Sequence, residues 1–130
     1  MIVVDASAIL EIMLRTGKSS KIEARIFRGN QTLHAPHLLD LEVIQVLRRY
    51  AGKDMSEDRA HLAIQDFLDI PIMRYPHDLF VPRIWELRKT LTAYDAAYVA
   101  LAETLDTQLL TCDSRLASSH RHSARIELVV

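Results

Sequence analysis

The chain has 130 residues, of which 49% are hydrophobic and 25% charged, a composition that is ordinary for globular proteins and excludes wholesale disorder. Its 16 basic and 17 acidic residues give a formal net charge of −1, which excludes a protein that binds polyanions through bulk charge. The length fits one domain over residues 1–130, and no apolar run approaches the ~18 residues that a membrane span needs. With one cysteine and no basic–apolar leader pattern, the expected location is cytoplasmic.

Short β-type runs alternate with helical stretches along the chain. In chain order, the pattern predicts strand 2–4, helix 6–15, helix 21–27, strand 32–35, helix 37–51, a helix capped by Ser56, strand 70–75, helix 79–91, helix 94–106, strand 108–112, helix 114–118 and strand 126–130. Strands separated by helices require right-handed crossovers between parallel strands. The predicted fold class is therefore α/β, with a central, mainly parallel sheet flanked by helices on both faces.

Four acidic residues from distant parts of the chain are expected to lie near one edge of this sheet. Asp5 and Asp113 each follow a predicted strand directly, and the carboxyl ends of parallel strands share one edge. Asp95 lies in the first turn, and Glu42 in the second turn, of helices that begin at that edge. The four carboxylates could therefore converge on one cleft.

Helix capping is the alternative explanation of each aspartate taken singly. Asp5 and Asp113 are good N-cap residues, and Asp95 forms a capping box with Thr92. Capping, however, does not require these acids on one rim, and clustered carboxylates repel one another unless a cation neutralises them. Ligands that are all oxygen atoms favour Mg²⁺, with Mn²⁺ as a substitute, over zinc.

Four segments of the sequence resemble the motifs of one known family. They are IVVDASA (residues 2–8), APHLLDLEV (35–43), LTAYDAAYVALAE (91–103) and LLTCDSRL (109–116). In this order they are similar to the PIN domain, specifically to the VapC-type ribonuclease toxins of prokaryotic toxin–antitoxin pairs. The resemblance implies a single PIN-like domain with a three-layer fold over residues 1–130.

The resemblance also implies a chemistry and a set of site residues. It implies a Mg²⁺-dependent endoribonuclease toxin, with Mn²⁺ as the alternative cation. By position, the implied metal ligands and catalytic residues are Asp5, Glu42, Asp95 and Asp113, supported by the hydroxyl groups of Ser7 and Thr111. This chain departs from many relatives at Gln45, where they have asparagine, and at Ser114 and Arg115, where some carry a further acid or amide.

The implied partners are an RNA substrate, a cognate VapB-type antitoxin and a second copy of the chain in a homodimer. Without the four site acids, 13 acidic residues face 16 basic ones, so the remainder carries a charge of +3. Candidate contacts to the RNA backbone, each also explicable as a solvated helix charge, are Arg48, Arg49, Arg88, Lys89 and Arg115. The apolar residues of the first two predicted helices would bind the antitoxin or the second copy, or simply pack in the core.

Two other functions were weighed against the nuclease. A catalytically silent PIN scaffold that binds RNA or a protein should lack one of the four acids, and none is missing. A receiver- or phosphatase-like domain should carry paired acids after its first strand, where this chain has Asp5-Ala6-Ser7. Trp85 is expected to pack in its helix with Ile84 and Leu87, with a base-stacking platform as the alternative. The six histidines are expected at the surface or in loops.

Overall fold

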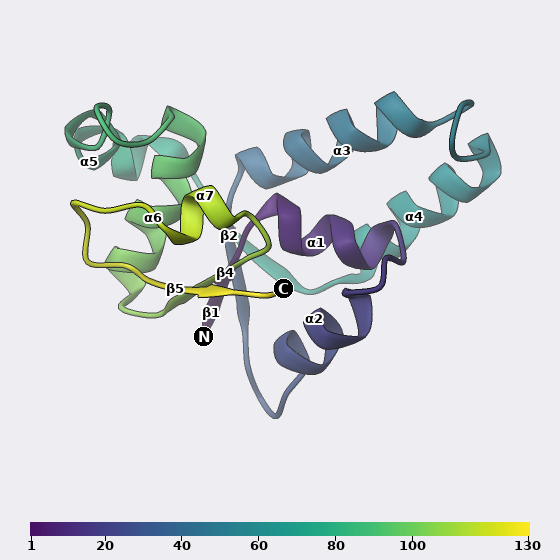
Figure 1. The fold of residues 1–130 in the computed structure, drawn as a ribbon, viewed down its shortest axis with the longest axis horizontal. Coiled ribbons are helices and arrows are strands. Elements are labelled where there is room, and N and C mark those ends of the chain that lie inside the picture. Colours follow the sequence, from purple (N-terminus) through teal and green to yellow (C-terminus); the bar gives the residue numbers. More distant parts are fainter.

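The computed structural model describes residues 1–130 and contains a five-stranded sheet in the order β3-β2-β1-β4-β5, shown in Figure 1. All four strand pairs are parallel. The strands are β1 (Ile2–Val4), β2 (Leu33–Pro36), β3 (Ile72–Tyr75), β4 (Gln108–Thr111) and β5 (Arg125–Leu128). The helices are α1 (Ala6–Met13), α2 (Ser19–Ile26), α3 (Leu38–Tyr50), α4 (Glu57–Asp69), the 3₁₀ helix η1 (His77–Phe80), α5 (Val81–Glu86), α6 (Ala93–Leu105) and α7 (Ser114–Ala117).

Helices cover both faces of the sheet, which confirms the predicted α/β class. In Figure 1, α5 and α6 lie on one side of the sheet, and α1 to α4 lie on the other. All three residues of β1 are buried, as expected for a strand that is covered on both faces. Helix α6 buries seven consecutive residues, 96–102, because it lies across the middle of the sheet against β1, β2 and β4. No helix combines the length and the apolar composition that a bilayer span requires.

The strand order places a topological switch point beside β1. The chain runs from β1 outward to β2 and β3, then returns to place β4 and β5 on the other side of β1. The crossovers on the two sides of β1 therefore run in opposite directions, and a crevice opens at the carboxyl ends of β1 and β4. Val4 pairs with Leu110, and the backbone N–H of Asp5 donates to the carbonyl oxygen of Leu110 at 3.3 Å.

The predicted helix 79–91 is divided, and this prediction was wrong. The segment forms η1 and then the short α5, which ends at Glu86. Pro82 stands in the first turn of α5, where a residue without a backbone N–H is tolerated. The same residue could not donate the backbone hydrogen bond that would continue the preceding helix through this position. The side chain of Trp85 is 66% exposed while Leu87 is buried, so Trp85 does not pack in the core as expected.

Three smaller differences have local causes. The first helix ends at Met13 instead of residue 15, because Arg15 adopts a positive φ of 51°. The last strand starts at Arg125, one residue early, in register with Gln108. His34 is buried in β2 rather than at the surface, and its two ring nitrogens lie 2.7 Å from the hydroxyls of Thr32 and Tyr75.

Glu103 on α6 fastens both α5 and the segment that leads to β5. Its carboxylate accepts from Arg83 Nε and Nη2 at 2.9 and 3.0 Å, and from the N–H and hydroxyl of Ser123 at 3.0 Å each. The hydrogen bond from Arg83 is the main reason why the pKa of Glu103 falls from 4.5 to about 2. The ionised form of Glu103 therefore stabilises the folded state.

Glu103→Gln should lower the free energy of unfolding by about 1–2 kcal/mol at neutral pH, because the substitution removes a charge-assisted, partly screened pair. The difference from wild type should shrink as the pH falls from 4.5 towards 2, where the wild-type carboxylate becomes protonated. Urea unfolding at several pH values measures this. Glu86→Gln is the matched control, since Glu86 also pairs with Arg83 but is 64% exposed. Equal losses for the two variants would contradict the special role of Glu103.

Candidate metal-binding site

Asp5 is held at the carboxyl end of β1 by three donors. It caps α1, and its Oδ1 accepts from the hydroxyl of Ser7 at 2.7 Å and from the N–H of Ala8 at 3.0 Å. Its Oδ2 accepts from the hydroxyl of Thr111, at the end of β4. A carboxylate offers about four acceptor positions, so these bonds leave room on Oδ2 for one further partner.

The two hydroxyl groups form a fixed support for Asp5. Ser7 Oγ accepts from the N–H of Cys112 at 2.9 Å, and Thr111 Oγ1 accepts from the N–H of Asp113 at 3.0 Å. Because the two backbone donors approach the hydroxyl oxygens, the hydroxyl hydrogens point to Asp5. This network of hydrogen bonds through Ser7 and Thr111 joins the end of β1 to the end of β4.

Glu42 is oriented by a residue that the sequence analysis did not select. The hydroxyl of Tyr98, on α6, donates to Glu42 Oε1 at 2.7 Å. Tyr98 is 2% exposed, so the hydrogen bond is shielded from water and keeps the half-buried Glu42 aimed across the sheet edge. A signal was available, because Tyr98 stands three residues after Asp95 and so lies on the same helix face.

Asp95 and Asp113 occupy the starts of two further helices. The N–H of Asp95 donates to the Thr92 side chain at 3.2 Å, which is the N-cap half of the predicted capping box. Asp113 caps α7 by accepting from the N–H of Arg115 at 2.9 Å. The Arg115 Nε lies 3.8 Å from Asp113 Oδ1, and this side chain is 93% exposed. An aspartate can therefore take part in capping its helix and still lie at the edge of the sheet where the other acids are expected.

The carboxylates influence one another electrostatically. Burial raises the pKa of Asp5 above its ordinary value, and the charge of Asp95 adds to this effect. Burial likewise raises the pKa of Glu42, with contributions from Asp5 and Asp95. The pKa of Asp95 is raised by burial and then by the charge of Asp113. Each acid therefore lies within the field of another, and a cation placed among them would relieve both the desolvation and the repulsion.

The donor set fits a hard divalent cation, although the side chains do not form a closed cage. No three His, Cys, Asp or Glu side chains are arranged closely enough to hold a metal ion as they stand. The available donors are carboxylate and hydroxyl oxygens, which are the ligands of Mg²⁺ or Mn²⁺, ions that keep several water ligands. Asp5, Glu42, Asp95 and Asp113 are the residues that would hold such an ion.

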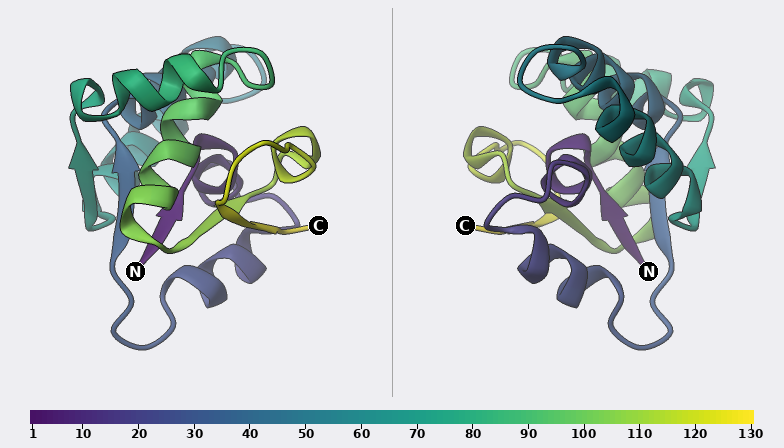
Figure 2. Two further views of the ribbon diagram at one scale, coloured as in Figure 1. Left: turned by 90° about the vertical axis from the view of Figure 1, so that its left-hand side faces the viewer. Right: turned by 90° about the vertical axis from the view of Figure 1, so that its right-hand side faces the viewer.

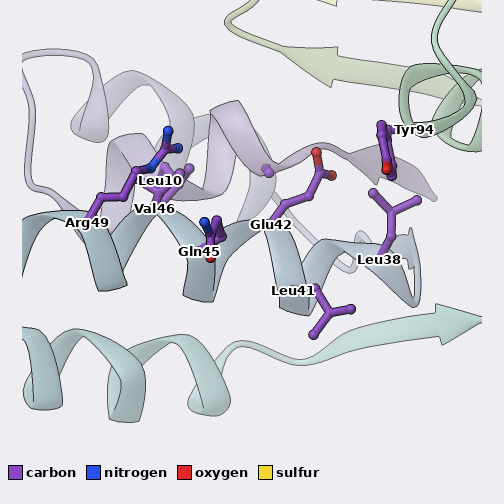
Figure 3. A pocket seen from close by; sticks show the side chains of 9 residues that line it. Leu10, Leu38, Leu41, Glu42, Gln45, Val46, Arg49 and Tyr94 are labelled. Carbon is purple, nitrogen blue, oxygen red and sulfur yellow. The ribbon is translucent and has the colours of Figure 1, made fainter.

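An apolar groove of about 390 Å³ leads away from Glu42 along α3, as Figure 3 shows. It runs between α1 and α3 and is bounded by Tyr94 at the start of α6 and by Arg49 further along α3. Gln45, at the position where many relatives have asparagine, lines this groove one turn beyond Glu42.

The five basic residues expected to contact RNA are all exposed but lie in different places. Arg49 lines the groove beside Glu42, and Arg115 lies beside Asp113. Arg48 instead lines a hollow between α3 and α4. Arg88 and Lys89 follow α5. The remaining acid of the second motif, Asp40, pairs with Arg74 at 2.8 Å, away from the four site acids.

Comparison with known proteins shows the family to which the chain belongs. The family model described as PIN domain matches residues 2–119. The chain is 47% identical over 130 residues to Ribonuclease VapC12 of Mycobacterium tuberculosis, with 99% of each chain covered. Two solved structures share the fold alone. The first is Mycobacterium tuberculosis VapC20, described as a sarcin-ricin loop cleaving toxin, with a TM-score of 0.69 and 15% sequence identity; the match covers 91% of this chain and 94% of that chain. The second is VapBC2 from Rickettsia felis bound to a DNA fragment from their promoter, with a TM-score of 0.70 and 12% identity; the match covers 98% of each chain. By the match to the family model and by its full-length relatives, this chain belongs to the PIN-domain family.

Proposed function

We propose that the chain is a divalent-metal-dependent endoribonuclease and the toxin of a toxin–antitoxin pair. The observation that supports the proposal is that the charges of Asp5, Glu42, Asp95 and Asp113 act on one another near the carboxyl ends of β1 and β4. Covalent catalysis by a thiol has no support, because burial raises the pKa of the only cysteine, Cys112, to about 11. The full-length relatives named as ribonucleases point to the same activity.

The residues of the proposed site would have different roles in hydrolysis. A bound Mg²⁺ or Mn²⁺ would supply an activated water at neutral pH and neutralise the phosphate charge. Asp5 and Glu42 accept hydrogen bonds from buried hydroxyl donors, so they would hold a bound cation in one place. Asp95 and Asp113 face the same edge from the starts of α6 and α7. Attack of water on phosphorus forms a new P–O bond, breaks the bond to the 3′ oxygen and leaves a 5′-phosphate and a 3′-hydroxyl.

The proposed function includes partners and a location. The partner is a VapB-type antitoxin, and one solved structure with the same fold is a VapBC assembly. The apolar groove beside Glu42, together with the exposed Leu41 and Ile44 on α3, offers the antitoxin or a second copy of the chain an apolar surface. We propose that the toxin is a homodimer that acts in the cytoplasm.

Digestion of total cellular RNA tests the activity. The wild type with Mg²⁺ should give discrete fragments, and EDTA should abolish them. Asp95→Ala should reduce cleavage at least ~100-fold, because it removes one of the carboxylates that hold the cation. Asp40→Asn is the control and should cleave like wild type, because Asp40 pairs with Arg74 outside the site. A folded, metal-supplied wild type that leaves tRNA, rRNA and mRNA intact would instead favour the catalytically silent scaffold.

Tyr98→Phe tests the orientation of Glu42. The variant keeps the aromatic ring in the core but removes the hydrogen bond to Glu42, so cleavage should fall roughly 10-fold while the fold persists. Single-turnover cleavage and circular dichroism measure the two effects. The matched control is Tyr94→Phe on the same helix, since Tyr94 is 65% exposed. If both variants cleave at the wild-type rate, the orienting role assigned to Tyr98 is wrong.

Asp5→Asn should raise the melting temperature of the metal-free protein by roughly 2–5 °C. The reason is that the substitution removes a buried charge that Asp95 repels, while the Thr111 hydroxyl can turn to accept from the new amide. Added Mg²⁺ should stabilise the wild type and leave Asp5→Asn unchanged. Thermal scans in EDTA and in Mg²⁺ measure both effects. An equal response of the two proteins to Mg²⁺ would contradict the assignment of Asp5 as a ligand.

A further inference from the structure

The only tryptophan of the chain is held at the surface with a cation stacked on it. Trp85, in α5, is 66% exposed. The guanidinium carbon of Arg88 lies 4.4 Å from the centre of the indole ring, and Arg88 Nη1 donates to the carbonyl oxygen of Trp85 at 2.9 Å. This hydrogen bond fixes the guanidinium over the ring, so the pair is a preformed, planar and positively charged surface.

The charges around this pair are uncompensated. Neither Arg88 nor Lys89 has an acidic side chain within ion-pair distance. The neighbouring acid, Glu86, is engaged by Arg83 at 2.9 Å. The segment after Trp85 therefore presents two positive charges beside an exposed aromatic face, which complements the phosphates and bases of a nucleic acid.

Helix α5, which carries Trp85, precedes in the chain the helix that carries Asp95. Only residues 87–91 separate α5 from Thr92, which caps α6 one turn before Asp95. Figure 2 shows α5 lying across the carboxyl end of the sheet, while α2 lies at the opposite end. A strand of RNA that reaches the carboxylates can therefore extend over α5.

We propose that Trp85 and Arg88 form a stacking platform for an unpaired base of the RNA whose phosphodiester lies at the acidic site. This inference rests on the ribonuclease function proposed above and adds a residue that selects the form of the substrate. A base in a duplex is already stacked on its neighbours and cannot lie on the indole, whereas a base in a loop or single strand can. The platform thus favours unpaired RNA of any sequence over duplex RNA.

A protein partner is the competing occupant of this surface. Leu79 and Val81 are also exposed, at 62% and 56%, and would suit an apolar contact with a second chain. Lys89 argues against it, because lysine is depleted at the centres of protein interfaces, whereas a polyanion neutralises the charges of both Arg88 and Lys89. The observations therefore favour RNA.

The sole tryptophan makes the test direct, because its fluorescence reports only on residue 85. The full-length Asp5→Asn protein, which should not cleave, is titrated with an oligoadenylate of roughly 10 nucleotides and with the same strand annealed to oligouridylate. We expect saturable quenching by the single strand and little quenching by the duplex. Fluorescence polarisation of the labelled oligoadenylate gives the affinity in parallel.

Substitutions separate stacking from general binding. In the Asp5→Asn background, Trp85→Ala should weaken oligoadenylate binding roughly 10-fold, and Trp85→Phe should stay within about 3-fold of the parent. Phe27→Ala is the matched control, since Phe27 is 53% exposed at the end of α2 and should bind like the parent.

Binding without quenching, or an unchanged affinity in Trp85→Ala, would overturn the platform even if the wild type cleaves RNA. The same holds if Trp85→Ala changes only the oligomeric state, which would assign the surface to a second chain. Quenching by the single strand in a protein that never cleaves would support the platform and contradict the ribonuclease function. The two proposals can therefore fail separately.

Discussion

The main physical constraint on this structure is the unfavourable free energy of keeping several carboxylates near one another at a partly buried edge of the sheet. Asp5 is 5% exposed, and each of Asp5, Glu42 and Asp95 has a raised pKa because burial and a neighbouring carboxylate oppose ionisation. Such an arrangement destabilises the metal-free fold and persists only where the surrounding structure determines it. The surrounding elements supply this through hydroxyl donors, helix starts and the well-packed strands below.

Each acid has its own local support, and the supports come from different elements. Ser7 and Thr111 join the ends of β1 and β4 around Asp5, while Tyr98 reaches from α6 to Glu42 on α3. Helix α6 therefore contributes Asp95 from one turn and the partner of Glu42 from the next. The buried face of α6 against β1, β2 and β4 fixes both residues relative to the sheet. The packing of α6 in the core therefore also determines where Asp95 and Tyr98 lie.

Much of this arrangement can be predicted from the sequence, since the fold class and the order of elements follow from apolar periodicity and from strand-end aspartates. What the sequence could not supply are contacts between distant residues, such as the hydrogen bond between Tyr98 and Glu42. The division of helix 79–91 at Pro82 and the outward position of Trp85 also escaped prediction. In both cases a short helix rotates its residues relative to the pattern that a longer helix would give. The metal-binding role of the acids stays a prediction.

X-ray diffraction from crystals soaked in Mn²⁺, collected at the manganese absorption edge, would locate a bound metal ion. We expect an anomalous peak between the carboxylates, with Asp5 Oδ2 at a distance of about 2.2 Å and side-chain rotation of Glu42 or Asp95 towards the ion. An RNA-cleaving preparation whose crystals show no peak there, or a peak elsewhere, would contradict this expectation. The three aspartates would then serve the fold at the starts of their helices, and the catalytic centre would lie in another part of the chain.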